Sequence, residues 1–172
     1  MLEKKLIQNG RKNPKKIIFI YNNKKITYSE FLNYVFYFSK FLKKKIKKNS
    51  KVLLIQKNSI EWAIHYFSIR LAGLTPIITS DEIPDYKLKL IINENKIRYV
   101  ISNKKIRFKN LILIKNIRRK KIKNSNNHKL KNKILGNEII YTSGTTGAPK
   151  GVILKLEMSY QVAKMINNIV KV

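Results

Sequence analysis

The sequence predicts an α/β domain built on a mostly parallel β-sheet with helices on both faces. Short apolar runs typical of buried strands, such as 52–55 and 74–79, alternate with segments in which apolar residues recur every three or four positions. Strands that alternate with helices are joined by helical crossovers, which make neighbouring strands parallel. The chain has 172 residues, 44% of them hydrophobic, which is enough for one domain with its own core.

The first third of the chain carries clear local signals. Apolar residues on both sides of Asn22-Asn23 predict a β-hairpin. Thr27 and Glu30 have the spacing of a capping box, so a helix should begin near Tyr28 and continue along an apolar stripe to about residue 46.

The residues that follow the strand at 52–55 repeat this pattern. Asn58 and Glu61 again have capping spacing, and Gly73 stands where a helix would end. Pro84 predicts the first turn of a helix that runs to about Glu94. Further strands are expected at 74–79, 99–102, 111–114 and 139–141, and a closing helix from the spacing of Met158, Val162, Met165 and Ile169. Residues 116–133 have little periodicity and many cations, which predicts a basic surface loop within the domain.

The formal net charge of +29 is typical of proteins that bind nucleic acids, but the composition favours another cause. The chain has 32 Lys, 28 Ile and 19 Asn but only 4 Ala, so it is rich in residues with A/T-only codons. This bias indicates codon drift, with lysines gathering at solvent-exposed positions. A nucleic acid is therefore not the expected partner. A protein that binds nucleic acids or anionic surfaces remains an alternative, and its binding would fall steeply with salt.

Other residue types narrow the possible chemistry. The absence of Cys excludes disulfides, thiolate zinc sites and a cysteine nucleophile. His65 falls in a helical stripe and is interpreted as a partly buried or surface packing residue, and no metal-ligand set is expected around His128. No apolar run approaches the ~20 residues of a membrane-spanning helix. The first residues lack a signal-peptide pattern, so a soluble, cytoplasmic protein is expected.

The stretch 142–151 differs from the rest of the chain, because it holds three of the six glycines. Glycines permit positive φ, so that successive backbone N–H groups can face inward and bind an anion. Hydroxyl side chains and Lys150 add further donors, and the loop follows a strand, where an open α/β sheet places its ligands. The pattern predicts a polyphosphate site that is not a Walker A loop. The alternative is an ordinary polar turn that binds nothing.

Residues 141–152 resemble the signature loop of the AMP-forming adenylate superfamily, which includes acyl- and aryl-CoA synthetases, luciferase-like enzymes and the adenylation domains of peptide synthetases. The segments 26–31, 58–73 and 84–102 resemble the same family in the same order. The resemblance covers about residues 15–171 with a gap at the basic loop. It implies that 1–172 is a partial AMP-binding domain, the N-terminal portion of the large domain of an adenylate-forming enzyme.

The resemblance also implies a reaction. In that family the loop holds the β- and γ-phosphates of ATP while a carboxylate attacks the α-phosphate, and a thiol then displaces AMP. ATP, Mg²⁺ and CoA or another thiol acceptor are the implied cofactors, although the magnesium ligand is not expected in this chain. The catalytic residues stay unknown, and the implied phosphate-binding residues are Thr142, Ser143, Gly144, Thr145, Thr146, Gly147 and Lys150.

The chain departs from the family in two respects. Lys155-Leu156 stands where the family usually has a Ser/Thr-His pair, and the family's catalytic unit is several times longer. We therefore expect part of an acid–CoA ligase for a fatty acid or related carboxylate, inactive alone, which a second chain with the missing C-terminal part could complete. Whether it is an enzyme by itself is left open. The alternative is a non-catalytic nucleotide-binding remnant without pyrophosphate exchange.

Overall fold

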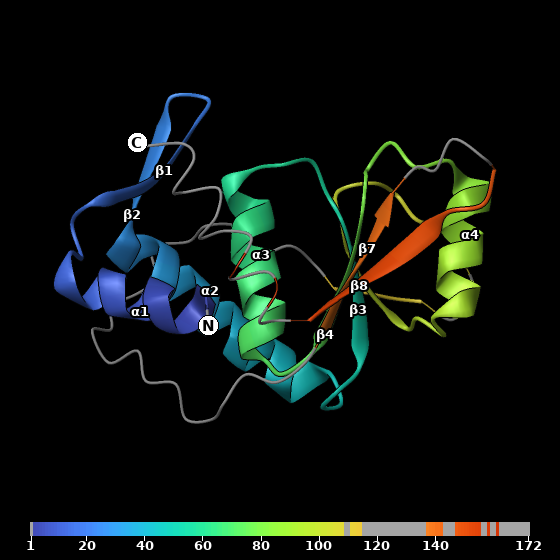
Figure 1. Ribbon diagram of the computed structural model, residues 1–172, viewed down its shortest axis with the longest axis horizontal. Coiled ribbons are helices and arrows are strands. Elements are labelled where there is room, and N and C mark those ends of the chain that lie inside the picture. Colours follow the sequence, from blue (N-terminus) through green and yellow to red (C-terminus); the bar gives the residue numbers. More distant parts are fainter. Residues whose placement is uncertain are drawn as a thin grey trace.

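The computed structural model describes residues 2–108, 111–114, 137–142, 147–155, 158 and 161. Figure 1 shows a β-sheet between helices, with a small hairpin projecting at one end. In chain order the elements are α1 (Leu2–Lys12), β1 (Ile17–Tyr21), β2 (Lys24–Thr27), α2 (Tyr28–Lys45), β3 (Lys51–Ile55), α3 (Ile60–Leu71), β4 (Thr75–Thr79), α4 (Asp85–Glu94), β5 (Tyr99–Ser102), β6 (Ile112–Leu113), β7 (Asn137–Thr142) and β8 (Lys150–Lys155).

The main sheet confirms the predicted fold class. Its six strands are ordered β6-β5-β3-β4-β7-β8. All neighbouring pairs from β6 to β7 are parallel, whereas β8 runs antiparallel to β7. Because β4 and β5 lie on either side of β3, the helices that connect them cover opposite faces of the sheet.

Alternate residues of β3 build two cores. Val52 and Leu54 pack with α2 and α3 on one face, and Leu53 packs with α4 on the other. All three side chains are fully buried. Burial of each such side chain contributes roughly 1.5–3 kcal/mol, so a strand that is apolar on both sides is stable only between two helical layers. Helices on both faces, as the sequence predicts, are therefore confirmed.

The N-terminal hairpin follows from its turn residues. Asn22 and Asn23 have φ values of 47° and 60°, a conformation that Asn tolerates better than most residues and that suits a tight hairpin turn. Directly after β2, the hydroxyl of Thr27 accepts a hydrogen bond from the backbone N–H of Glu30 at 3.3 Å, and the Glu30 carboxylate accepts one from the backbone N–H of Thr27 at 2.9 Å. The predicted capping box is thus confirmed, and α2 begins at Tyr28.

The next helix corrects the sequence interpretation. The predicted cap was Asn58, but α3 is capped by Ser59, whose hydroxyl accepts from the backbone N–H of Trp62 at 3.0 Å. The two residues are adjacent and both can cap a helix, so spacing alone selected the wrong one. The strand β8 and the helix α1 were not predicted, and β7 is longer than the predicted 139–141. The predicted basic loop at 116–133 and most of the predicted closing helix lie outside the described residues.

Within the described part of the chain, no helix is both long and apolar enough to cross a membrane.

Candidate functional site

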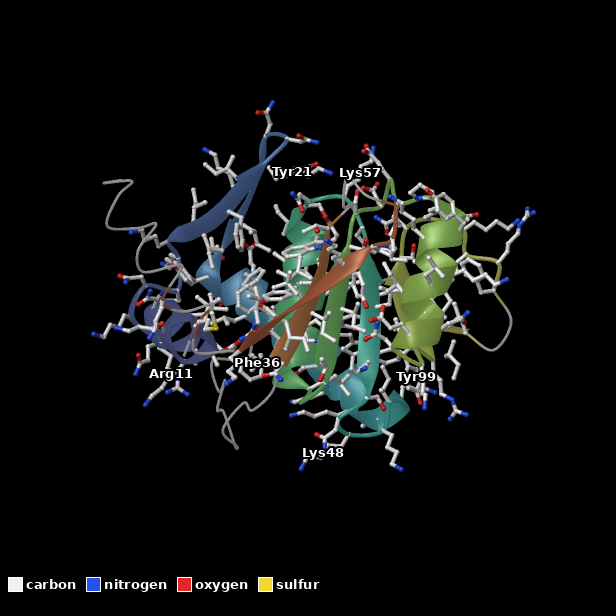
Figure 2. The ribbon with its side chains drawn as sticks, turned by 45° about the vertical axis from the view of Figure 1, so that its right-hand side comes forward. Arg11, Tyr21, Phe36, Lys48, Lys57 and Tyr99 are labelled. Carbon is white, nitrogen blue, oxygen red and sulfur yellow. The ribbon has the colours of Figure 1, made fainter. Side chains whose placement is uncertain are left out.

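The glycine-rich stretch connects β7 to β8 at the carboxyl end of the sheet. In Figure 2, Lys57 lies just past β3 at one end of the sheet, and Lys48 lies just before β3 at the opposite end. Since β7 is parallel to β4 and β4 to β3, the end of β7 at Thr142 points the same way as the Lys57 end. This is the edge at which open α/β sheets bind their ligands.

Three of the seven predicted phosphate-binding residues are described. Thr142 ends β7 and Lys150 begins β8, and the two are paired in the antiparallel register. Both side chains are exposed. Gly147 has a φ of +90°, which a side chain would disfavour. The other predicted residues, Ser143, Gly144, Thr145 and Thr146, lie outside the described residues.

The arrangement of these three residues suits an anion. A hydroxyl donor and an ammonium group stand on facing positions where the connection leaves the two strands, and Gly147 supplies the backbone freedom for inward-facing N–H groups. The ammonium group of Lys150 forms no ion pair with another described residue. Among the described residues, no three His, Cys, Asp or Glu side chains are grouped so that they could hold a metal ion.

Tyr141 anchors the end of β7, a role that no pattern in the sequence indicated. Its hydroxyl donates a hydrogen bond to the Glu94 carboxylate and accepts one from the Asn95 side-chain amide, both at 2.7 Å. Burial, together with the hydrogen bond to Glu94, raises the pKa of the Tyr141 phenol above its usual value, so the phenol keeps its proton. We call Tyr141 of β7, Glu94 at the C-terminal end of α4 and the adjoining Asn95 the phenol anchor.

Glu138 anchors the start of β7 on the other face of the sheet. Its carboxylate forms an ion pair with Arg70 of α3 at 2.7 Å and accepts a hydrogen bond from Tyr66. Arg70 also pairs with Glu3 of α1, and all four side chains are buried. We call this group the ionic anchor. Burial raises the pKa of Tyr66 far above its usual value, so Tyr66 remains a neutral donor.

His65 lies in a third polar group at the carboxyl end of β3. Its Nδ1 lies 2.7 Å from the side-chain oxygen of Gln56, whose amide nitrogen donates to Asn103 at 2.9 Å. Burial lowers the pKa of His65 to about 4, against a smaller opposing effect of Glu61. Only 2% of His65 is exposed, so the prediction of a partly buried or surface residue was wrong. The helical stripe did not reveal that α2 covers the ring.

Comparison with known proteins places these features in a family. The family model described as AMP-binding enzyme matches residues 6–170. The chain belongs to this family. Among curated relatives, a subunit of the mycosubtilin synthase of Bacillus subtilis is 21% identical over 154 residues, covering 86% of this chain and 6% of the relative. Gramicidin S synthase 2 of Brevibacillus brevis is 28% identical over 155 residues, covering 84% of this chain and 3% of the relative.

Solved structures show the same fold. An o-succinylbenzoate CoA synthetase from Bacillus subtilis, in complex with an acyl-adenylate intermediate, superposes with a TM-score of 0.78 at 16% identity, covering 97% of this chain and 46% of that one. The N-terminal subdomain of NpsA from Klebsiella oxytoca gives 0.71 at 19% identity, with 88% and 41% covered. The fold is thus that of the N-terminal domain of adenylate-forming enzymes, and the chain spans less than half the length of these structures.

Proposed function

We propose that the chain supplies the ATP-phosphate-binding part of an AMP-forming acid–CoA ligase that activates a fatty acid or a related carboxylate. The observation that carries this proposal is the exposed pair of Thr142 and Lys150, which face each other where β7 and β8 lead into the glycine-rich stretch. Membership of the AMP-binding family supports ATP as the nucleotide that binds. One structural relative is a CoA synthetase, which supports CoA as the thiol acceptor.

In this reaction a carboxylate oxygen of the acid attacks the α-phosphorus of ATP, and the bond between that phosphorus and the bridging oxygen breaks. The products are an acyl-adenylate and pyrophosphate, and the thiolate of CoA then displaces AMP. The negative charge that develops on the leaving pyrophosphate is stabilised by donors already in place. Lys150 would supply a fixed positive charge there, and Thr142 a hydroxyl donor. Mg²⁺ would add charge neutralisation at the phosphates when bound.

We further propose that the chain alone binds ATP without completing the reaction, and that a further polypeptide part completes the site. The relatives support this, because the chain covers 46% of the CoA synthetase structure and a few per cent of the peptide synthases. The departure at Lys155-Leu156 supports it as well, since the family usually has a Ser/Thr-His pair there.

Titration of the purified chain with ATP and Mg²⁺ tests the phosphate site. Lys150→Ala should raise the Kd for ATP about tenfold, because a charge-assisted hydrogen bond contributes roughly 1.5–3 kcal/mol. Lys48→Ala is the matched control, since Lys48 is also exposed but lies at the opposite end of the sheet. Equal weakening by both variants would mean that ATP responds only to the overall positive charge, and the assigned site would be wrong.

A pyrophosphate exchange assay separates the binding role from the whole reaction. The chain alone, given ATP, labelled pyrophosphate and a panel of fatty and aromatic acids, should incorporate no label into ATP. Exchange that depends on one acid would overturn the proposed incompleteness and would at the same time identify the substrate.

A further inference from the structure

The two strands of the candidate site are held together at one particular pair of residues. Tyr141 and Gly151 face each other in the register, directly next to the pair formed by Thr142 and Lys150. We call these two pairs the neck, because they stand where β7 and β8 lead into the glycine-rich stretch. Any shift of Tyr141 along or across the sheet would displace Thr142, its neighbour in β7, and Lys150, which is paired with Thr142.

Gly151 is required by the ring of Tyr141. A Cβ atom added to Gly151 would lie 2.8 Å from the ring carbon Cζ and 3.0 Å from the hydroxyl oxygen of Tyr141. Contacts this short do not occur in folded proteins, so any other residue at position 151 would displace the ring or the strand. The close approach brings the backbone of β8 directly over the phenol.

The ring itself cannot move freely, because its hydroxyl group is held from two sides. Asn95 donates one amide hydrogen to the Tyr141 oxygen and another to the backbone oxygen of Ile91, at 2.7 and 3.1 Å. The remaining Asn95 oxygen accepts from Lys51 at 3.2 Å. The Glu94 carboxylate accepts a hydrogen bond from the phenol O–H. The phenol anchor is thus fastened to α4 and to the start of β3.

We propose that Tyr141 is a positioning residue for Thr142 and Lys150: Glu94 and Asn95 fix its ring, and the ring sets where the neck lies. This inference rests on the proposed function for its ligand, ATP, but the position of the neck can be tested without it. Tyr141 acts on the phosphates only through Thr142 and Lys150, since it is buried and they are exposed.

Tyr141→Phe tests the proposal, because it keeps the ring and removes both hydrogen bonds of the hydroxyl group. Backbone hydrogen exchange at residues 141, 142, 150 and 151 should become about tenfold faster, since a strand freed from its anchor opens locally. The Kd for ATP should rise about fivefold, since misplaced donors stabilise phosphates less well. Ser68→Ala is the matched control. It also removes a buried hydroxyl group. The Ser68 hydroxyl lies 2.6 Å from the backbone oxygen of Ile64 in α3 and 3.0 Å from that of Val35 in α2.

Unchanged exchange at the neck in Tyr141→Phe, or an equal increase in Ser68→Ala, would overturn the proposal. If the wild-type chain fails to bind ATP, the proposed function is wrong, and the exchange measurement still decides whether Tyr141 sets the neck. Glu94→Gln provides the conservative rescue. Its amide oxygen can still accept the hydrogen bond of the phenol O–H, so backbone exchange should stay near the wild-type rate, whereas Glu94→Leu should resemble Tyr141→Phe.

A double-mutant cycle isolates the contact between the ring and Gly151. Gly151→Ala should weaken ATP binding about tenfold in the wild-type background, because the new methyl group meets the ring. In a Tyr141→Val background, where the ring is absent, the same change should alter the Kd less than about twofold. Equal effects in the two backgrounds would show that Gly151 is needed for some reason other than Tyr141.

Discussion

The two ends of β7 are held in different ways. At the start, the ionic anchor ties Glu138 to Arg70 and through it to Glu3, all of them buried. Near the end, the phenol anchor ties Tyr141 to α4 through two hydrogen bonds of one uncharged hydroxyl group. Loss of one partner of a buried ion pair costs about 3–5 kcal/mol, whereas loss of the partners of an uncharged phenol costs about 1–3 kcal/mol. We therefore propose that the start of β7 serves stability and that its end serves the proposed phosphate site.

Arg70→Met should have the largest effect and tests the first half of this comparison. The change removes the cation that pairs with both buried carboxylates, Glu3 and Glu138, so the free energy of unfolding should fall by about 3–5 kcal/mol. Urea denaturation followed by circular dichroism measures the loss. The triple variant Glu3→Gln, Arg70→Met, Glu138→Gln should recover most of it, since no charge is then buried. A loss below about 1 kcal/mol for Arg70→Met would break the comparison.

The next largest effect is the pH dependence of stability that His65 causes. His65 lies on the same helix as Arg70 but is buried without charge. The unfolded chain protonates His65 near pH 6.5, whereas the folded chain does so near pH 4. Between these values the unfolded state binds more protons, so the free energy of unfolding should fall by about 3 kcal/mol as the pH drops from 6.5 to 4. Above pH 6.5 this contribution is fully present.

Denaturation curves at several pH values, recorded for the wild type and for His65→Gln, measure this effect. The difference between the two proteins isolates His65 from the carboxylates that also titrate at low pH. If both proteins lose the same free energy of unfolding over this pH range, His65 is not the group responsible. The comparison between a group buried without charge, His65, and a buried cation, Arg70, would then fail.

Tyr141→Phe should have the smallest effect on stability. Loss of the two hydrogen bonds of the phenol should lower the free energy of unfolding by about 2 kcal/mol, because the ring and its packing remain. The same urea denaturation measures it. A loss above about 3 kcal/mol would place the phenol anchor beside the ionic anchor as a determinant of the fold, and the proposed division of roles along β7 would no longer hold.

The sequence predicted features that depend on neighbouring residues, such as helix caps. It did not predict contacts between residues that are far apart in the chain. The capping box of Thr27 and Glu30 depends on residues three apart and was predicted correctly. The strand β8 was missed, because it begins inside the glycine-rich stretch and its apolar side chains Val152 and Ile153 are exposed, so neither alternation nor a buried run marks it. Whether the predicted loop residues bind phosphate stays a prediction.

Both anchors of β7 escaped the sequence analysis for one physical reason. Arg70 and Glu138 are 68 positions apart, and Tyr141 is 47 positions from Glu94. No periodicity relates residues at such separations, because the sheet order β3-β4-β7 and the crossing of α4 bring them together only in the folded chain. The composition likewise gives no sign that Glu3 and Glu138 are buried in the folded chain.

The contact between Tyr141 and Gly151 also constrains how this sequence can evolve. Codon usage that drifts towards A+T replaces glycine codons readily, and it has left only six glycines in the chain. Position 151 cannot follow that drift while an aromatic ring fills the space beside it. A lineage that loses the ring first would be free to lose the glycine, whereas the reverse order passes through a distorted intermediate. We therefore expect the two positions to change together across descendants, with the aromatic residue changing first.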